Sequence, residues 1–365
     1  MRALVVCALI VSIGTWLGLH GLMSKGRPDA LSALNVEGSP RNNVVLRSPW
    51  ANADLRVSPT LLVHCAAWKA ATSDGGNPSG LGPVADRARA ILATDPSESG
   101  KVTWLYVAAI LTILDDQVST RERIDVLRSW FHRSSRDDEN IDLTGYLVAL
   151  SQTLDAQRAS WCAQAADMDL IANTVVADLG LRWPAALEFI ASTYVDAAPQ
   201  NPTITCYVVE ELPFEGGVNV LVPHSNGRRE SVPTIILGTV SPDLQSPSSV
   251  LMHEFVHVMD AFYHRPFLHK AGSGLHVPDQ RQQWQRAQLE HVIVGAEGSL
   301  ALRHVGLTPT GYWADPMAVC EVYSSGTRVV SNEDVVCVYD AWQAYRNGGV
   351  LDDVELLLRS LMVID

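Results

Sequence analysis

The sequence predicts an α+β protein with a helical first half and a second half that combines helices with a small mixed sheet. Three observations lead to this class. Residues 61–154 place apolar side chains at helical spacing, with no strand pattern between them. Three short runs rich in β-branched residues follow residue 200 and are separated by Gly, Pro and Asn. Long helical patterns then return and continue to the C-terminus.

The N-terminal 27 residues have the pattern of an export segment. An apolar run from Ala3 to Met23 follows Met1-Arg2 and ends at Lys25 and Arg27. About twenty apolar residues can span a bilayer, and this run fits a cleaved signal peptide and an uncleaved membrane anchor equally well. We therefore expect an extracytoplasmic protein that is secreted or anchored in a membrane through residues 3–23. Residues 28–60, rich in Pro, Ser, Asn and Arg, are expected to form a tether.

The composition is that of a globular protein, with 47% hydrophobic and 18% charged residues. The formal net charge is −13, and no basic stripe offsets it. Such a surface repels phosphate groups, so we expect no nucleic-acid binding. Five of the six cysteines lie outside the apolar run, which allows two disulfides and one free thiol in an oxidising compartment.

Residues 61–165 are expected to form a helical domain, and no motif in them indicates a role. Its predicted helices cover residues 61–71, 84–94, 102–115, 120–132 and 143–154.

Residues 166–365 form the second predicted domain. Two helices, 167–179 and 184–194, lead into strands 203–209, 217–222 and 232–239. A strongly signalled helix then covers 250–263, with Ser246 as its cap and Pro247 in its first turn. Further helices are expected at 279–304, 316–324, 332–346 and 352–362. We expect Pro233–Thr239, just before the capped helix, to be an edge strand that can bind an extended polypeptide.

The capped helix carries the motif His253-Glu-Phe-Val-His257. Side chains at positions i and i+4 of a helix lie on one face, so both imidazoles can bind one zinc ion. Glu254 stands beside the first ligand, where a carboxylate can act as general base toward a water on the metal. Asp260 lies on the same stripe and is expected to accept a hydrogen bond from the free ring N–H of a ligating histidine.

A third protein ligand must come from another part of the chain. The favoured candidate is Glu321, which lies 64 positions after His257 on a helix that Asp315-Pro316 can start. Glu290 and Glu297, on the long intervening helix, are the alternatives. Tyr312 and Tyr323 flank the Glu321 region and are candidates to donate a hydrogen bond to an oxyanion.

The stretch His253-Glu-Phe-Val-His-Val-Met-Asp260 resembles the HEFxHxxD signature shared by the catalytic domain of anthrax lethal factor and the Mlc titration factor A family of peptidases. The stretch Tyr312–Tyr323 is similar to the second motif of these families, although the family spacing from tyrosine to ligand glutamate would end at Val319. The resemblance implies a zincin-like metallopeptidase domain and zinc-dependent hydrolysis of a polypeptide substrate. The alternative is a catalytically degenerate zinc-binding module that acts through protein partners. The sequence gives no indication of the oligomeric state.

Overall fold

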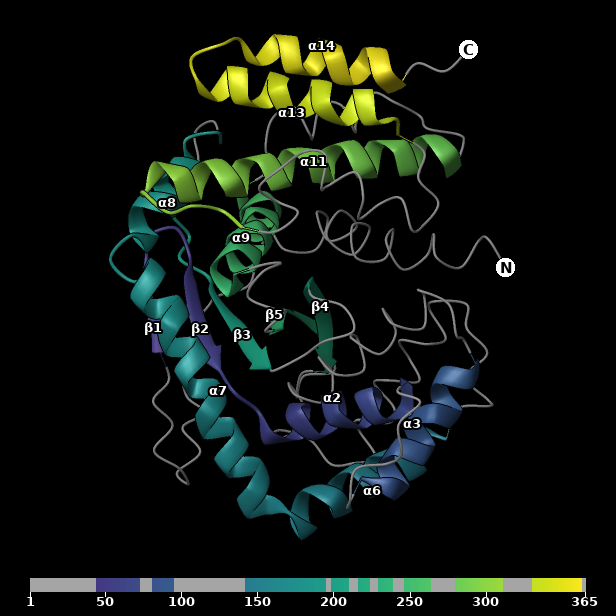
Figure 1. Ribbon diagram of the computed structural model, residues 1–365. Helices are drawn as coiled ribbons and strands as arrows, with labels where there is room; N and C mark the ends of the chain where they lie inside the picture. Colours follow the sequence, from purple (N-terminus) through teal and green to yellow (C-terminus); the bar gives the residue numbers. More distant parts are fainter. Residues whose placement is uncertain are drawn as a thin grey trace. The chain divides into compact units, whose positions relative to one another are not determined.

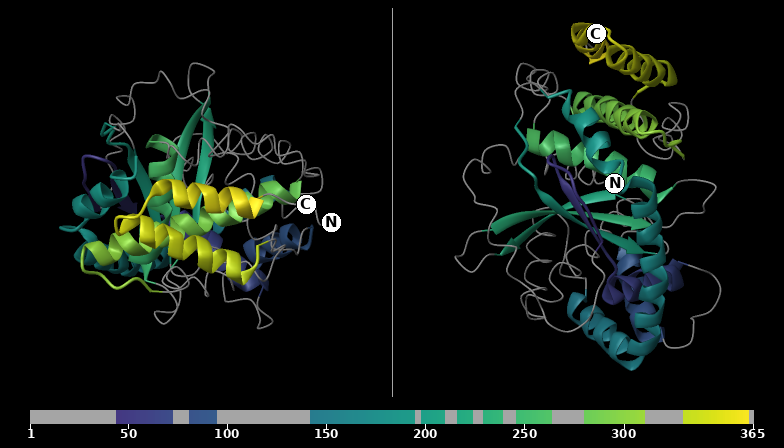
Figure 2. Two further views of the ribbon diagram at one scale, coloured as in Figure 1. Left: turned by 90° about the horizontal axis from the view of Figure 1, so that it is seen from above. Right: turned by 90° about the vertical axis from the view of Figure 1, so that its left-hand side faces the viewer.

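The computed structural model describes residues 44–72, 81–94, 142–194, 198–209, 216–223, 229–238, 246–263, 280–310 and 330–362. These residues form a mixed α+β protein that is mostly helical and holds a small sheet, so the predicted class is confirmed (Figures 1 and 2). The expected helices at 102–115, 120–132 and 316–324 lie outside the described residues, as does the apolar run 3–23. No helix in the described part of the chain is long and apolar enough to cross a membrane.

Contacts divide the described chain into two compact units, each discontinuous in sequence. The first holds described residues from Leu55–Thr174 and Thr205–Val240, and the second those from Ile13–Asp54, Val175–Ile204 and Ser241–Asp365. The helix α7 (Arg158–Leu179) contains the residue at which we expected the second domain to begin, 166.

The strands follow the order β1-β2-β3-β5-β4. Strand β5 (Arg229–Gly238) runs parallel to β3 (Thr203–Val209) and antiparallel to β4 (Gly216–Pro223). Because β5 is paired on both sides, the prediction that Pro233–Thr239 is an edge strand is wrong. Its Pro233 lies opposite Asn219 of β4. Strands β1 (Val44–Leu46) and β2 (Asn52–Arg56) lie in the segment that we expected to be a tether, and most of β2 is buried.

The first unit contains α2 (Pro59–Thr72), α3 (Gly82–Thr94) and α6 (Leu143–Ala156), close to the expected helices. A buried hydrogen bond of 2.6 Å joins His64 Nδ1 to the Tyr146 hydroxyl and links α2 to α6. Asp142 caps α6 by accepting a hydrogen bond from the Gly145 N–H at 2.8 Å. It also forms an ion pair with Arg87 of α3.

In the second unit, α8 (Trp183–Ala191) packs against α9 (Pro247–Tyr263) and α11 (Gln280–His304). Trp183 follows the end of α7 and is fully buried, with its ring 4.6 Å from that of Phe255 in an edge-to-face pair. Its indole N–H donates to the Ala51 carbonyl at 3.1 Å, which satisfies this buried donor. Helix α9 is buried on nearly every side, as expected for a helix surrounded by its own unit.

Helices α13 (Asn332–Arg346) and α14 (Leu351–Met362) stack on α11 as the C-terminal helical layer (Figure 1). Ser331 and Asp334 form a complete capping box at the start of α13, with both hydrogen bonds at 3.0 Å. The core of this layer consists of apolar side chains from the three helices and from Val330, two residues before α13: Leu289, Val292, Ile293, Ala296, Val330, Val335, Val338, Tyr339, Trp342, Val354 and Leu358.

The described cysteines form no disulfide with one another. Cys65 and Cys206 are buried as free thiols, and Cys162 and Cys337 are exposed as free thiols. Burial raises the pKa of the Cys65 thiol to about 12, so this thiol stays protonated and unreactive at neutral pH.

Candidate metal centre

Helix α9 carries the HExxH motif and is fixed at its N-terminal end by hydroxyl groups. Ser246 Oγ accepts a hydrogen bond from the Ser249 N–H at 3.2 Å, which confirms the predicted cap. The Ser246 N–H in turn donates to Thr310 Oγ1 at 2.7 Å, and the Thr310 N–H donates to Ser249 Oγ at 3.1 Å. These bonds join the start of α9 to the segment that follows α11.

The C-terminal end of α9 is held by Tyr263. Its hydroxyl donates to the Trp50 carbonyl at 2.6 Å and accepts from the Gln200 N–H at 2.9 Å. The Tyr263 ring also meets the Trp50 ring edge-on at 5.4 Å. Because both ends are fixed, contacts outside the HExxH motif determine the orientation of α9 and of its central turn.

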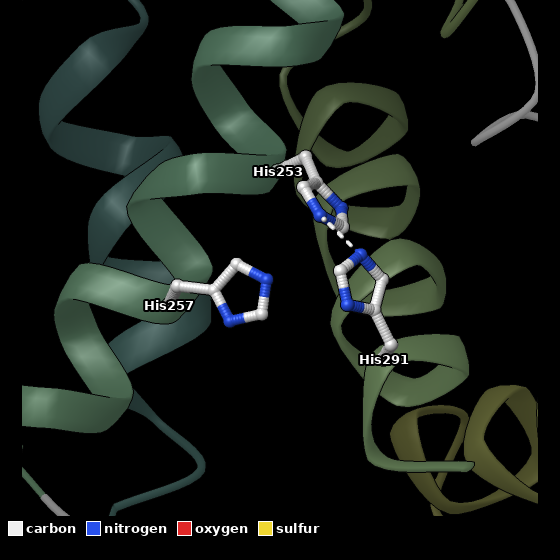
Figure 3. Close-up of side chains that lie close together, drawn as sticks. All are labelled: His253, His257 and His291. Atoms are coloured by element: carbon white, nitrogen blue, oxygen red, sulfur yellow. Dashed lines mark hydrogen bonds between the residues drawn. The ribbon is translucent and has the colours of Figure 1, made fainter. Parts of the chain in front are cut away.

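Three histidines from two helices converge near this central turn. His253 and His257 come from α9, and His291 comes from α11 (Figure 3). Their ligand atoms all lie within 4.8 Å of one another, and the ring centroids are 4.8–5.0 Å apart. The closest pair is His253 Nε2 and His291 Nε2, at 3.0 Å. This group of imidazole nitrogens could hold a metal ion.

Gly298 allows the two helices to come this close. A Cβ atom at this position would lie 3.3 Å from His253 Cα and 3.4 Å from His253 N, tighter than ordinary van der Waals contact. Gly298 lies seven residues after His291, so both fall within about 20° of the same helix face. The side of α11 that bears His291 therefore packs its backbone directly against the turn that bears His253.

Burial favours the neutral forms of two of these imidazoles. The pKa of His253 lies well below its ordinary value because of burial and, to a smaller extent, the neighbouring His291 and His257. Burial alone lowers the pKa of His291 to about 4. At neutral pH these imidazoles are uncharged, and a metal ion can use a ring lone pair without displacing a proton from it.

Glu254 is a buried carboxylate within the same turn of α9, with 9% of its surface exposed. Carboxylates are rarely buried this far without a partner, and Glu254 does have interactions within the protein. Its place beside His253 is compatible with the predicted role of general base.

Asp260 accepts a hydrogen bond from the Tyr194 hydroxyl at 2.5 Å. Tyr194 is buried and its ring lies 5.8 Å from that of Tyr263, so this contact belongs to the aromatic cluster at the end of α9. The predicted bond from Asp260 to a ligating histidine stays a prediction.

The glutamates that were expected as possible third ligands differ in their surroundings. Glu297 is fully buried, and its carboxylate accepts from the Trp342 indole and pairs with Arg346 on α13. Glu290 is half-buried and directly precedes His291. Glu321, Tyr312 and Tyr323 lie outside the described residues, so the structure tests none of their expected roles. Among the described residues, the third ligand atom near His253 and His257 is a nitrogen of His291.

Sequence reasoning favours Glu321 and gives the 279–304 helix only as the alternative, and it overlooks His291 on that helix. We considered Glu290 and Glu297 on the predicted 279–304 helix because glutamate ligands are common in similar motifs. A usable signal was present in the combination of His291 with Gly298 seven residues later. A polar side chain and a glycine on the same face of a helix can indicate a close helix contact beside a site.

Comparisons of the chain with protein-family models, with curated proteins and with solved structures gave no match.

The lowered pKa of His291 predicts how the stability of the metal-free protein depends on pH. Above about pH 6.5 the folded and unfolded states are both neutral at this residue, so the pKa difference has no effect. Below that pH the unfolded state binds a proton at this residue, whereas folded His291 takes one up only near pH 4. The free energy of unfolding should therefore decrease as the pH is lowered from about 6.5 to about 4. The slope for one such histidine is at most about 1.4 kcal/mol per pH unit.

Chemical denaturation of the metal-free protein at pH 7.0 and at pH 5.0 measures this effect. A His291→Gln variant, which cannot titrate, should lose part of the difference. A metal-free protein that is equally stable at both pH values, or more stable at the lower one, would contradict the prediction.

Proposed function

We propose that the protein is a zinc-dependent peptidase with a zincin-like catalytic domain. This proposal rests on the convergence of three imidazoles at the HExxH turn of a buried helix. Ligands of tetrahedral zinc at 2.0–2.1 Å stand about 3.3 Å apart, and the His253–His291 nitrogen pair at 3.0 Å is close to that spacing. Three nitrogen ligands and one open position make up the ligand set of a catalytic zinc site.

The choice of zinc follows from the chemistry of the donors. Imidazole nitrogen suits zinc and other late first-row metals, whereas calcium and magnesium prefer oxygen ligands. When bound, zinc lowers the pKa of a coordinated water toward 7 and polarises a carbonyl group. His253, His257 and His291 would hold the ion in this proposal.

The residues of the chain would then carry out the proton transfers. Glu254 takes the proton of the attacking water as the oxygen bonds to the peptide carbonyl carbon. It then delivers that proton to the leaving amine nitrogen as the carbon–nitrogen bond breaks. The burial of Glu254 and His253 keeps bulk water away from these transfers, which strengthens the electrostatic interactions within the site.

The proposed substrate is a polypeptide, and the proposed location is outside the cytoplasm, with residues 1–27 directing export. Metal analysis of the purified full-length protein, together with a screen of unstructured polypeptides such as casein, tests the activity. We expect about one zinc per chain and hydrolysis that a chelator abolishes and added zinc restores. A chain that binds zinc stoichiometrically and cleaves none of the polypeptides would favour the degenerate module instead.

A further inference from the structure

Glu297 is a buried carboxylate that the proposed catalytic cycle does not use. It has no exposed surface, and its Oε2 accepts a hydrogen bond from the Trp342 indole N–H at 2.8 Å. The same oxygen lies 3.2 Å from Nε of Arg346, whose side chain is itself only 8% exposed. Burying two charges is costly, and such a pair stabilises a fold less than its contacts suggest.

The guanidinium of Arg346 joins three helices of the second unit. It extends from the last turn of α13 and pairs with Glu297 of α11 through Nε. Its Nη2 donates to the Phe189 carbonyl of α8 at 2.6 Å, and its Nη1 donates to Ser192 Oγ just beyond α8 at 3.1 Å. It also stacks over the Phe189 ring at 3.8 Å. The planar, forked group of arginine can satisfy all these contacts at once, which lysine cannot do.

Two of these helices are those that set the geometry of the histidine group. Helix α11 carries His291, and α8 contacts α9 through the Trp183–Phe255 pair. Glu297 lies six residues after His291 and hence about 120° around α11 from it. One face of α11 therefore points His291 and Gly298 toward α9, while another is fixed by Glu297 toward α13. A rotation of α11 that moved His291 away from His253 would also pull Glu297 out of its ion pair.

We propose that Glu297 and Arg346 are positioning residues that fix the rotation of α11 against α8 and so hold His291 in place beside His253 and His257. This role rests on the proposed metal site. In this role Glu297, one of the residues expected as an alternative metal ligand, orients the helix that carries His291 and does not bind the metal itself. Groups that hydrogen-bond a metal ligand commonly change metal affinity by about 10- to 100-fold when they are replaced, and a contact that acts through the ligand's helix is expected at the lower end of that range.

Two full-length variants test the proposal. Glu297→Gln combined with Arg346→Met removes both charges, keeps an acceptor for the Trp342 indole, and avoids leaving one buried charge uncompensated. Arg346→Lys keeps the charge opposite Glu297 but loses the planar fork and its contacts to α8. The matched control is Glu355→Gln combined with Arg359→Met, which neutralises the ion pair between half-buried Glu355 and exposed Arg359 on α14.

Thermal denaturation shows whether each variant is folded, and competition with a chromogenic chelator gives its zinc affinity. The visible spectrum of the cobalt-substituted protein reports the geometry of the ligands, which a purely structural role would leave unchanged. We expect the folded test variants to bind zinc about 10-fold more weakly or worse, with an altered cobalt spectrum, and the control to match the parent.

The outcomes separate this role from the proposed function. A parent that binds no zinc would overturn both. A parent that binds zinc, with a folded test variant of unchanged zinc affinity and cobalt spectrum, would overturn only the positioning role. If one test variant fails to fold, the other decides. If both unfold while the α14 control stays folded, the ion pair is needed for the fold itself, and the positioning role is rejected.

Discussion

Glu254→Gln should abolish most peptide hydrolysis while leaving the metal site loaded. Glutamine has nearly the size and polarity of glutamate but cannot take up the proton of the attacking water. A positioned acid–base group typically contributes a factor of about 10² to 10⁴ to the rate, and we expect a loss in that range. The loss should appear in kcat, because proton transfer belongs to the transition state rather than to substrate binding.

The measurement is the steady-state rate of cleavage of one polypeptide by the parent and the variant, each with its zinc content determined on the same sample. Glu254 is buried, so thermal denaturation must accompany the assay to show that the variant is folded. Glu355→Gln, the same chemical change in the α14 ion pair with Arg359, is the matched control and should retain full activity. A zinc-loaded Glu254→Gln variant that cleaves as fast as the parent would refute the proposed mechanism.

Much of the fold could be predicted because its signals are local. The strand Thr203–Val209 and the helix Asn332–Arg346 have the bounds that were expected from the sequence. The short strands β1 and β2 were not predicted, because three to five residues are too few to show a period. The partners of β5 were also not predictable. Whether a strand lies at an edge depends on which other strands pair with it, and its own residues do not record this.

The candidate site likewise has a part that the sequence could predict and a part that it could not. His253 and His257 could be paired from the sequence because one helical turn separates them. His291 lies 38 positions from His253, and the two meet only because α11 packs against α9 at Gly298. Arg346, far along the chain, also contacts both α8 and α11. No local pattern contains this information, and the preference for a glutamate ligand in similar motifs directed attention to the neighbouring acidic residues.

His291→Ala should reduce bound zinc to well below one equivalent, and Glu321→Ala should not. Removing one of three nitrogen ligands leaves two, and water must replace the third at a large cost in affinity. His291 stands 3.0 Å from His253 at its nearest nitrogen, and its imidazole is neutral at physiological pH, so the apoprotein already provides this ligand. The measurement is zinc stoichiometry and affinity for both variants and the parent under identical conditions.

Glu290→Ala, which changes the residue directly before His291 on the same helix, is the matched control for damage to α11. We expect it to bind zinc within a few-fold of the parent, because its carboxylate does not belong to the group of converging ligand atoms. The reverse pattern, in which Glu321→Ala loses zinc and His291→Ala retains it, would show that the glutamate is the third ligand. His291 would then be a neighbour of the metal centre without coordinating it, and its close approach to His253 would reflect helix packing at Gly298 alone.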